Sequence, residues 1–260
     1  MHRFTNKGVG LAYIDVPANA GEGPPVLLIH GFASNHAVNW IAPQWVRSLT
    51  HAGYRVIALD NRGHGQSDKL YEPEAYSTYA MADDGRALLD HLGIARAGVI
   101  GYSMGARIAA FLTRAHPERV AALSMGGLGY RLVDGVGLPL GIADALEAPS
   151  LADVADPMGR TFRAFADQNR QDLRALAACI RGSRQTMPLE QVRMILTPTI
   201  ICVGTADPIA GDGEKLARMM PNAVSFDIVG RDHNLAVGDR THRAAVVDYF
   251  RKHWKNETEQ

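Results

Sequence analysis

Short runs of apolar, often β-branched residues alternate along the chain with longer amphipathic stretches. This alternation is typical of parallel strands joined by crossover helices. It predicts strands at residues 26–30, 55–60, 98–102, 120–125, 199–203 and 224–229. The runs at 26–30 and 199–203 are almost continuously apolar, which indicates central strands covered on both faces. Residues 11–16 are expected to form an antiparallel strand at one edge of the sheet.

The amphipathic stretches predict helices at residues 40–51, 76–92, 104–115, 214–220 and 240–254. The alternation is interrupted between residues 131 and 190, where no strand-like run occurs and the sequence favours helices punctuated by Gly and Pro. We expect residues 131–190 to form a small helical cap, inserted into an α/β core made of residues 1–130 and 191–260. Such a cap would lie over the carboxyl edge of the sheet, where open α/β sheets place their ligands.

One short motif joins a predicted strand to a predicted helix. Gly101-Tyr102-Ser103-Met104-Gly105 fits the pattern G-x-S-x-G. A serine on so sharp a turn has a strained backbone, and its flanking glycines are needed because side chains there would collide with neighbouring strands. The turn would project the hydroxyl beside the unpaired N–H groups of the helix N-terminus. We therefore predict that Ser103 is a nucleophile; the alternative interpretation is a serine near a helix cap.

A serine hydroxyl needs a base that accepts its proton and later returns it to the leaving group. His233 is predicted to be this base because it lies after the last predicted strand and before the last predicted helix. Asp207 follows the strand at 199–203, so we expect it at the same sheet edge, where its carboxylate would fix the imidazole tautomer. Asp212 is the closest alternative for the acid, and Asp232 is too near His233 in sequence to be a good partner.

The first buried strand ends in His30-Gly31-Phe32. This turn is predicted to aim the backbone N–H of Phe32 at a developing oxyanion, together with the N–H of Met104 from the motif above. His30 itself is expected to be structural. Asn35 and His36 continue the same loop and are candidate substrate contacts.

Composition narrows the possible partners. Lys plus Arg and Asp plus Glu balance at 27 each, so net charge favours neither nucleic acid nor an anionic membrane. No run of about 18 apolar residues and no secretory h-region occur, which predicts a cytoplasmic protein without a membrane anchor. The two cysteines, Cys179 and Cys202, are interpreted as packing residues. No metal-binding or dinucleotide-binding motif is found, so no cofactor or metal is predicted. The expected partner is a small-molecule substrate, and no oligomeric state is indicated.

With these residues the chain resembles the α/β-hydrolase superfamily over nearly its whole length. Residues Asp60-Asn61-Arg62-Gly63-His64-Gly65-Gln66-Ser67 are similar to the family's D-x-R-G-x-G-x-S turn, which is structural in the family. The resemblance implies that Arg62, His64 and Ser67 hold loops together. It also implies an α/β-hydrolase fold, with an eight-stranded, mostly parallel sheet, flanking helices and a small helical cap.

The resemblance also bears on the reaction. Relatives that dehalogenate haloalkanes or open epoxides carry aspartate where this chain has Ser103, so acyl transfer through a serine ester is favoured. The implied function is a serine hydrolase that cleaves a small carboxylic ester or lactone through an acyl-enzyme. A carbon–carbon bond hydrolase of the same fold is an alternative, although the His-Gly-Phe turn departs from the Gly-rich oxyanion loop usual there. A ligand-sensing protein that retains the triad is a further alternative.

Residues that would set substrate choice are expected in the cap. Phe162, Phe165 and Met187 have the spacing either of pocket-lining residues or of the cap's own apolar core. The second interpretation is favoured because apolar residues at such spacing are more often core.

Overall fold

The centre of the fold is an eight-stranded sheet with the order β1-β2-β4-β3-β5-β6-β7-β8. The computed structural model describes residues 1–135 and 138–254. Strands β3 to β8 run parallel, and β1 and β2 are antiparallel to their neighbours. The predicted mostly parallel α/β sheet is therefore confirmed. The strands are β1 (His2–Asn6), β2 (Val9–Val16), β3 (Pro25–Ile29), β4 (Arg55–Leu59), β5 (Ala97–Tyr102), β6 (Val120–Gly126), β7 (Thr199–Gly204) and β8 (Ala223–Ile228).

The edge of the sheet differs from the prediction. Residues 11–16 were expected at the edge, but they belong to β2, which lies between β1 and β4. The edge strand is β1, joined to β2 by a two-residue turn in which Lys7 and Gly8 both have positive φ. Only two side chains of β1, Phe4 and Asn6, are buried, so its sequence carries almost no apolar pattern.

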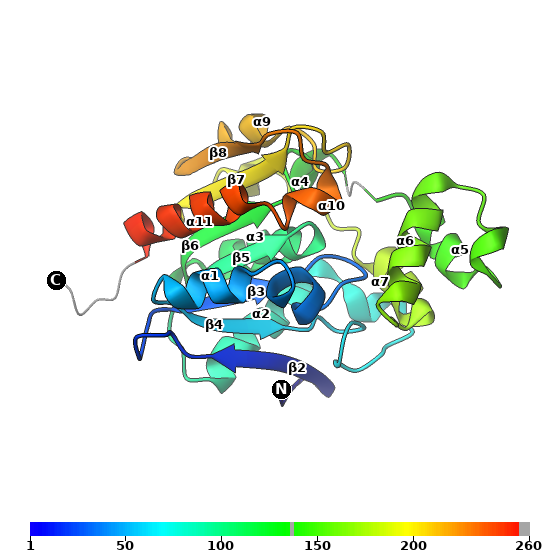
Figure 1. Cartoon of the computed structure of the whole chain (residues 1–260), viewed down its shortest axis with the longest axis horizontal. Helices are drawn as coiled ribbons and strands as arrows, with labels where there is room; N and C mark the ends of the chain where they lie inside the picture. Colours follow the sequence, from blue (N-terminus) through cyan, green and yellow to red (C-terminus); the bar gives the residue numbers. More distant parts are fainter. Residues whose placement is uncertain (136–137, 255–260) are drawn as a thin grey trace.

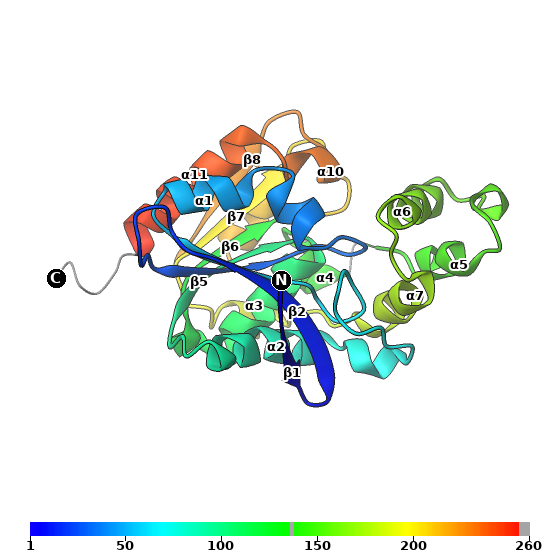
Figure 2. The same ribbon diagram turned by 60° about the horizontal axis from the view of Figure 1, so that its bottom comes forward.

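Helices cover both faces of the sheet, as Figures 1 and 2 show. On one face, α1 (Trp45–His51) and α11 (Arg240–His253) pack over an apolar cluster that includes Trp45 and Phe250. On the other face lie α2 (Thr78–His91), α3 (Met104–Ala115) and α9 (Gly213–Ala217), over a cluster that includes Leu27, Ile29 and Leu112. Because both faces are covered, the central strands are buried along their length.

Three predicted helices have different bounds. The helix expected at residues 40–51 is two elements, a π-helical turn η1 (Ala37–Ile41) and α1, separated where Pro43 is followed by Gln44 with a φ of 67°. The helix expected at 76–92 begins as a 3₁₀ turn, η2 (Pro73–Tyr76), and restarts at Ser77, whose hydroxyl accepts the N–H of Ala80. The helix expected at 214–220 is the shorter α9, and η3 (Pro117–Arg119) and α10 (His233–Ala236) were not predicted.

Between residues 131 and 190 the described residues contain helices and no strand. These are α4 (Arg131–Asp134), α5 (Gly141–Glu147), η4 (Leu151–Asp153), α6 (Pro157–Gln168), α7 (Leu173–Gly182) and α8 (Leu189–Val192). We call α5, α6 and α7 the helical unit; it has its own apolar cluster and lies beyond the carboxyl ends of the parallel strands (Figure 1). The division into a core and a cap at residues 131 and 190 stays a prediction. Residues 136–137 of the predicted cap and 255–260 of the predicted core lie outside the described residues.

Candidate active site

Ser103 lies on the sharp turn between β5 and α3, with a φ of 54° and a ψ of −115°. Such a backbone costs a non-glycine residue about 1–3 kcal/mol. A Cβ atom on Gly101 would lie 2.3 Å from the carbonyl oxygen of Gly105, and one on Gly105 would lie 1.9 Å from that of Ile29. The two glycines of the motif therefore have a steric cause, since α3 crosses directly over the strands there.

The structure brings the three predicted side chains together in one line. Ser103 Oγ lies 2.9 Å from His233 Nε2, and His233 Nδ1 lies 2.7 Å from Asp207 Oδ2. The His233 side chain is 9% exposed and that of Asp207 is fully buried. In this arrangement the Ser103 hydroxyl donates to Nε2, while Nδ1–H donates to the carboxylate. Ser103 follows β5, Asp207 follows β7 and His233 follows β8, so three parallel strands place all three groups at one sheet edge.

Main-chain N–H groups hold the carboxylate of Asp207 in place. The neighbouring acids Asp212 and Asp232 are bound to other main-chain N–H groups. Asp207 Oδ1 accepts the N–H groups of Ile209 and Ala210 at 2.8 and 3.0 Å, which leaves Oδ2 for His233. Asp212 caps α9 by accepting the N–H of Lys215, and Asp232 caps α10 by accepting the N–H groups of Asn234 and Leu235. Neither alternative acid contacts the imidazole.

Two backbone N–H groups beside Ser103 are unpaired. In residues 1–135 and 138–254, the N–H of Phe32 finds no acceptor, and that of Met104 belongs to the first residue of α3. His30 orients the first of them. Its Nδ1–H donates to the carbonyl of Gly31 at 2.8 Å, and its Nε2 accepts the N–H of Asn61 at 3.0 Å. Because the Gly31 carbonyl and the Phe32 N–H share one planar trans peptide, they point in opposite directions, so His30 fixes the donor's direction.

A second side chain holds the same turn, and sequence reasoning missed it. Asn39 lies in η1, is buried, and accepts the N–H of Gly31 with its Oδ1 at 3.0 Å. Burial lowers the pKa of His30 to about 4, so the ring that donates to the Gly31 carbonyl is neutral near pH 7. The turn is thus held by a neutral histidine and an amide.

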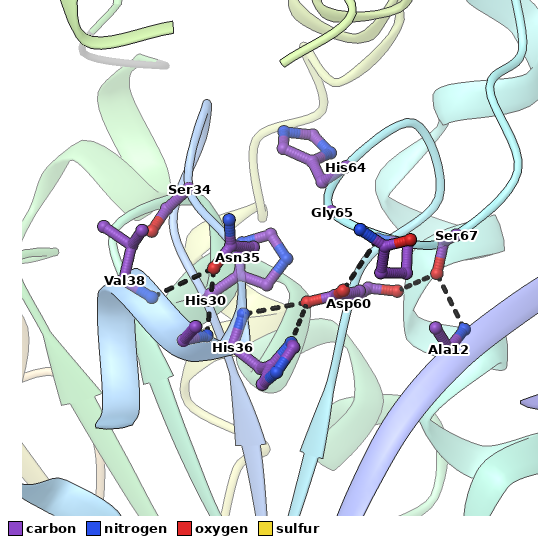
Figure 3. A network of polar contacts seen from close by, with 12 residues as sticks. Ala12, His30, Ser34, Asn35, His36, Val38, Asp60, His64, Gly65 and Ser67 are labelled. Atoms are coloured by element: carbon purple, nitrogen blue, oxygen red, sulfur yellow. Dashed lines mark hydrogen bonds and ion pairs between the residues drawn. The ribbon is translucent and has the colours of Figure 1, made fainter. Parts of the chain in front are cut away.

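Asn35 and His36, the two candidate substrate contacts on this loop, both make hydrogen bonds within the protein, and their contact with substrate stays a prediction. Neither Asn35 nor His36 lines a space at Ser103 in the part of the chain that the structure describes. Asn35 Oδ1 accepts the N–H groups of Ala37 and Val38 at 2.9 Å and so starts η1. His36 is buried and donates through its backbone N–H and Nδ1 to Asp60, both at 2.8 Å. Figure 3 shows these contacts, in which both side chains hold the loop.

Asp60 is the centre of this network (Figure 3). It is fully buried, and its Oδ2 accepts the N–H of Gln66, while its backbone carbonyl accepts the hydroxyl of Ser67. Burial raises the pKa of Asp60, but the hydrogen bond from His36 and the neighbouring N–H groups outweigh it and lower the pKa to about 2. The turn at residues 60–67 is thereby tied to the loop that carries Phe32.

Two hollow spaces meet at Ser103. The inner pocket is small, with a cavity volume of about 30 Å³, and its apolar walls are Phe32, Met104, Leu128, Leu138, Ile180 and Ile209. The outer cleft is larger, with a cavity volume of about 330 Å³, and its walls include Val38, Asn39, Phe162, Phe165, His233 and Val237. Phe32 and Ser103 border both spaces. The outer cleft lies within the roughly 300–1,000 Å³ that is usual for small-molecule sites, and the inner pocket is smaller than that.

Phe162, Phe165 and Met187, the three apolar residues considered for substrate choice, lie in different places. Phe162 and Phe165 line the outer cleft and also pack against the cluster of the helical unit. The ring centroid of Phe162 lies 5.9 Å from that of Phe32, so α6 contacts the turn that carries Phe32. Met187 lies in the main apolar cluster of the sheet and lines neither space.

Arg107 was not predicted. It follows Ser103 by one helical turn, is 3% exposed, and borders the inner pocket. Its guanidinium donates at 2.6 to 3.3 Å to the carbonyls of Arg131, Leu132, Gly135 and Gln185. Burial lowers the pKa of Arg107 to about 10, which still leaves it charged at neutral pH. Arg107 therefore ties α3 to the chain on both sides of the helical unit.

The described residues provide no metal centre. Across residues 1–135 and 138–254, no group of three or more His, Cys, Asp or Glu side chains is arranged to hold a metal ion. In the same ranges no helix has the length and apolar character to cross a membrane.

Comparison with known proteins identifies the family. The family profile described as the alpha/beta hydrolase fold matches residues 24–191. The chain belongs to the α/β-hydrolase fold family. The non-heme chloroperoxidase CPO-A1 of Kitasatospora aureofaciens is 27% identical over 91% of this chain and 94% of that protein. Epoxide hydrolase B of Mycobacterium tuberculosis is 34% identical over 54% of this chain, which amounts to 40% of the epoxide hydrolase.

Solved structures of the family have the same architecture. The enol-lactonase from Burkholderia xenovorans LB400 superposes with a TM-score of 0.79 at 21% identity. The superposition covers 96% of this chain and 100% of the lactonase. This likeness shows the fold.

Proposed function

We propose that this α/β-hydrolase cleaves a small carboxylic ester or lactone through an acyl-enzyme. Ser103 is the nucleophile, His233 its general base and acid, and Asp207 the carboxylate that orients the imidazole. The line from Ser103 Oγ through His233 to Asp207, at 2.9 and 2.7 Å, is the observation that carries this proposal. A serine at this turn favours acyl transfer, because its hydroxyl forms an ester with the acyl group.

In the proposed first half-reaction, Ser103 Oγ forms a bond to the substrate carbonyl carbon while its proton passes to His233 Nε2. The carbonyl oxygen becomes an oxyanion that accepts the N–H groups of Phe32 and Met104. The bond to the leaving oxygen then breaks, and that oxygen takes the proton from Nε2. Removal of one oxyanion donor typically costs about 10²–10³ in rate.

In the second half-reaction a water molecule replaces the alcohol. His233 accepts a proton from this water, whose oxygen attacks the acyl carbon and regenerates the oxyanion. The bond to Ser103 Oγ breaks, Oγ recovers the proton from Nε2, and the carboxylic acid is released. Asp207 stays ionised throughout and stabilises the imidazolium.

The test combines ester turnover with chemical labelling. p-Nitrophenyl acetate and butyrate are incubated with the protein and with Ser103→Ala; we expect turnover that falls by about 10⁴-fold or more in the variant. A phosphonate probe should label Ser103, identified by peptide mass spectrometry. Labelling at another residue contradicts the nucleophile. Preference for a dienone ring-fission substrate over both esters favours carbon–carbon cleavage instead. Sluggish turnover with a ligand-dependent rise in Tm favours a sensor.

A further inference from the structure

The two spaces at Ser103 do not meet the reacting groups in the same way. Met104, which supplies one oxyanion N–H, borders the inner pocket, whereas His233 borders the outer cleft. Phe32, which supplies the other N–H, borders both. The inner pocket therefore opens beside one oxyanion donor and the outer cleft beside the imidazole, while Phe32 and Ser103 border both spaces.

This asymmetry places the two halves of an ester. Since His233 Nε2 returns its proton to the leaving oxygen, the alcohol portion must lie on the side where His233 is exposed, in the outer cleft. The oxyanion points to Phe32 and Met104, and the attacking Oγ occupies the third position of the tetrahedral carbon. The acyl chain takes the fourth position and extends into the inner pocket.

The walls of the inner pocket fit a short, uncharged acyl chain. Its polar side chains are already engaged: Arg107 donates to four main-chain carbonyls, and the Ser183 hydroxyl donates to the carbonyl of Cys179 at 2.7 Å. The remaining side chains, such as Leu138 and Ile180, are apolar. A carboxylate at the end of the acyl chain would be desolvated there against apolar side chains and an occupied guanidinium.

The outer cleft fits a larger, uncharged and apolar alcohol portion. Its cavity volume is about 330 Å³, against about 30 Å³ for the inner pocket. Phe162 and Phe165 of α6 form one wall, with Val38 and Val237 on others. No Asp, Glu, Lys or Arg from the described ranges lines it. Aromatic walls of this kind suit an aromatic ring in stacked or edge-on contact.

We propose that the preferred substrates are uncharged esters of a short-chain acid with a bulky aromatic or other apolar alcohol. This inference rests on the proposed function, and it assigns the inner pocket to the acyl chain and the outer cleft to the alcohol. The helical unit then selects the substrate through α6 on the alcohol side and through α7, with Ile180, on the acyl side.

Two isomeric esters test the assignment with the unmodified protein. Benzyl acetate and methyl phenylacetate contain the same atoms, but the phenyl ring lies on the alcohol side of the first and the acyl side of the second. We expect kcat/KM for benzyl acetate to be at least about tenfold higher, since misfitting groups in an apolar pocket cost about 10- to 200-fold. Equal values, or a preference for methyl phenylacetate, would overturn the proposal.

Two variants test which space causes the preference for benzyl acetate, measured as the ratio of its kcat/KM to that of methyl phenylacetate. Phe162→Ala removes an aromatic wall of the cleft, so the ratio should fall at least about threefold, mainly through a higher KM for benzyl acetate. Ile180→Ala enlarges the inner pocket, so the ratio should fall by a gain in kcat/KM for methyl phenylacetate. Leu146→Ala is the matched control, because Leu146 is buried in the same cluster and lines neither space. If Leu146→Ala shifts the ratio as far as the other two do, the two spaces are not its source.

A charged acyl chain gives an independent measurement. Monomethyl succinate, which would carry its carboxylate into the inner pocket, should be hydrolysed at least about tenfold more slowly than methyl butyrate. Faster hydrolysis would instead make Arg107 a carboxylate site and overturn the assignment.

Ethyl acetate separates failure of this inference from failure of the proposed function. Hydrolysis of ethyl acetate that depends on Ser103, without a preference between the isomers, overturns the inference alone. Absence of hydrolysis of every ester overturns both.

Discussion

The sheet edge that carries Ser103 and the helical unit above it are held in place by different means. At the sheet edge the main chain decides: Ser103 has a positive φ, and Gly105 leaves no room for a Cβ atom. In the helical unit, apolar side chains such as Ile142, Leu146 and Leu176 pack on one another. Main-chain constraints accept few residue types, whereas apolar packing accepts many. We infer that the reaction is fixed by the first region and substrate choice is open to change in the second.

The largest expected effect is a loss of activity at the sheet edge, in a variant that keeps the fold. Asp207→Asn keeps the shape of the side chain but removes the charge that orients His233, so kcat should fall by about 10⁴-fold. Asp212→Asn and Asp232→Asn are matched controls, because each caps a helix and should cost about 1 kcal/mol or less in the free energy of unfolding. Ester kinetics and urea unfolding of the three variants check this. An equal loss of kcat in Asp232→Asn would reassign the acid.

A glycine substitution tests the main-chain constraint itself. In Gly105→Ala the new Cβ atom would lie 1.9 Å from the carbonyl oxygen of Ile29, so we expect a loss of about 4 kcal/mol or more in the free energy of unfolding, or failure to fold. Gly141→Ala in α5 is the control, since nothing lies within 4 Å of its Cβ position, and alanine is the better helix former by up to about 1 kcal/mol. Similar unfolding midpoints for the two variants would contradict the contrast.

The same contrast explains what the sequence predicts. Gly101, Ser103 and Gly105 can be predicted from the sequence because the turn accepts few other residue types. Asp207 and His233 can be predicted because each follows a strand. The main sheet and most of the covering helices are predictable for another reason, because their apolar patterns are long. The edge strand β1 and the break after η1 depend on single residues, such as Gly8 and Pro43, whose effect on the backbone is local.

Other parts of the site depend on tertiary contacts that no local pattern carries. Asn39 binds the Gly31 N–H from a π-helical turn, and Arg107 reaches carbonyls on both sides of the helical unit. His36 lies in a sequence typical of an exposed loop, yet the buried carboxylate of Asp60 accepts both its backbone N–H and its ring N–H. Loop position alone gives no sign of this contact with Asp60, and a role for His36 in substrate binding stays a prediction.

Acid should weaken the core before the helical unit. Burial lowers the pKa of His30 and His242 to about 4 and that of His64 to about 3, and residues 131–190 contain no histidine. Each ring has a lower pKa folded than unfolded, so stability is complete above about pH 6.5 and is lost as the pH falls toward 4. The free energies of unfolding at pH 7 and 5, obtained from urea titrations, should differ by about 1–2 kcal/mol per ring. His242→Gln should reduce that difference by one ring's share; an unchanged difference would contradict the assignment.

The smallest effect compares one buried tyrosine from each region. Tyr102 donates its hydroxyl to the carbonyl of His233 at 2.5 Å, while Tyr76, packed under α7, donates to the carbonyl of Leu70 at 2.6 Å. Tyr102→Phe and Tyr76→Phe should each cost about 1–3 kcal/mol in the free energy of unfolding, because each removes the hydroxyl that a carbonyl accepts, and Tyr76→Phe also removes the acceptor of the Leu70 N–H. Only Tyr102→Phe should also lower kcat, by about three- to tenfold with little change in KM, because only that hydroxyl positions the base. Equal falls in kcat would mean that general loosening of the fold, rather than the position of His233, limits the rate.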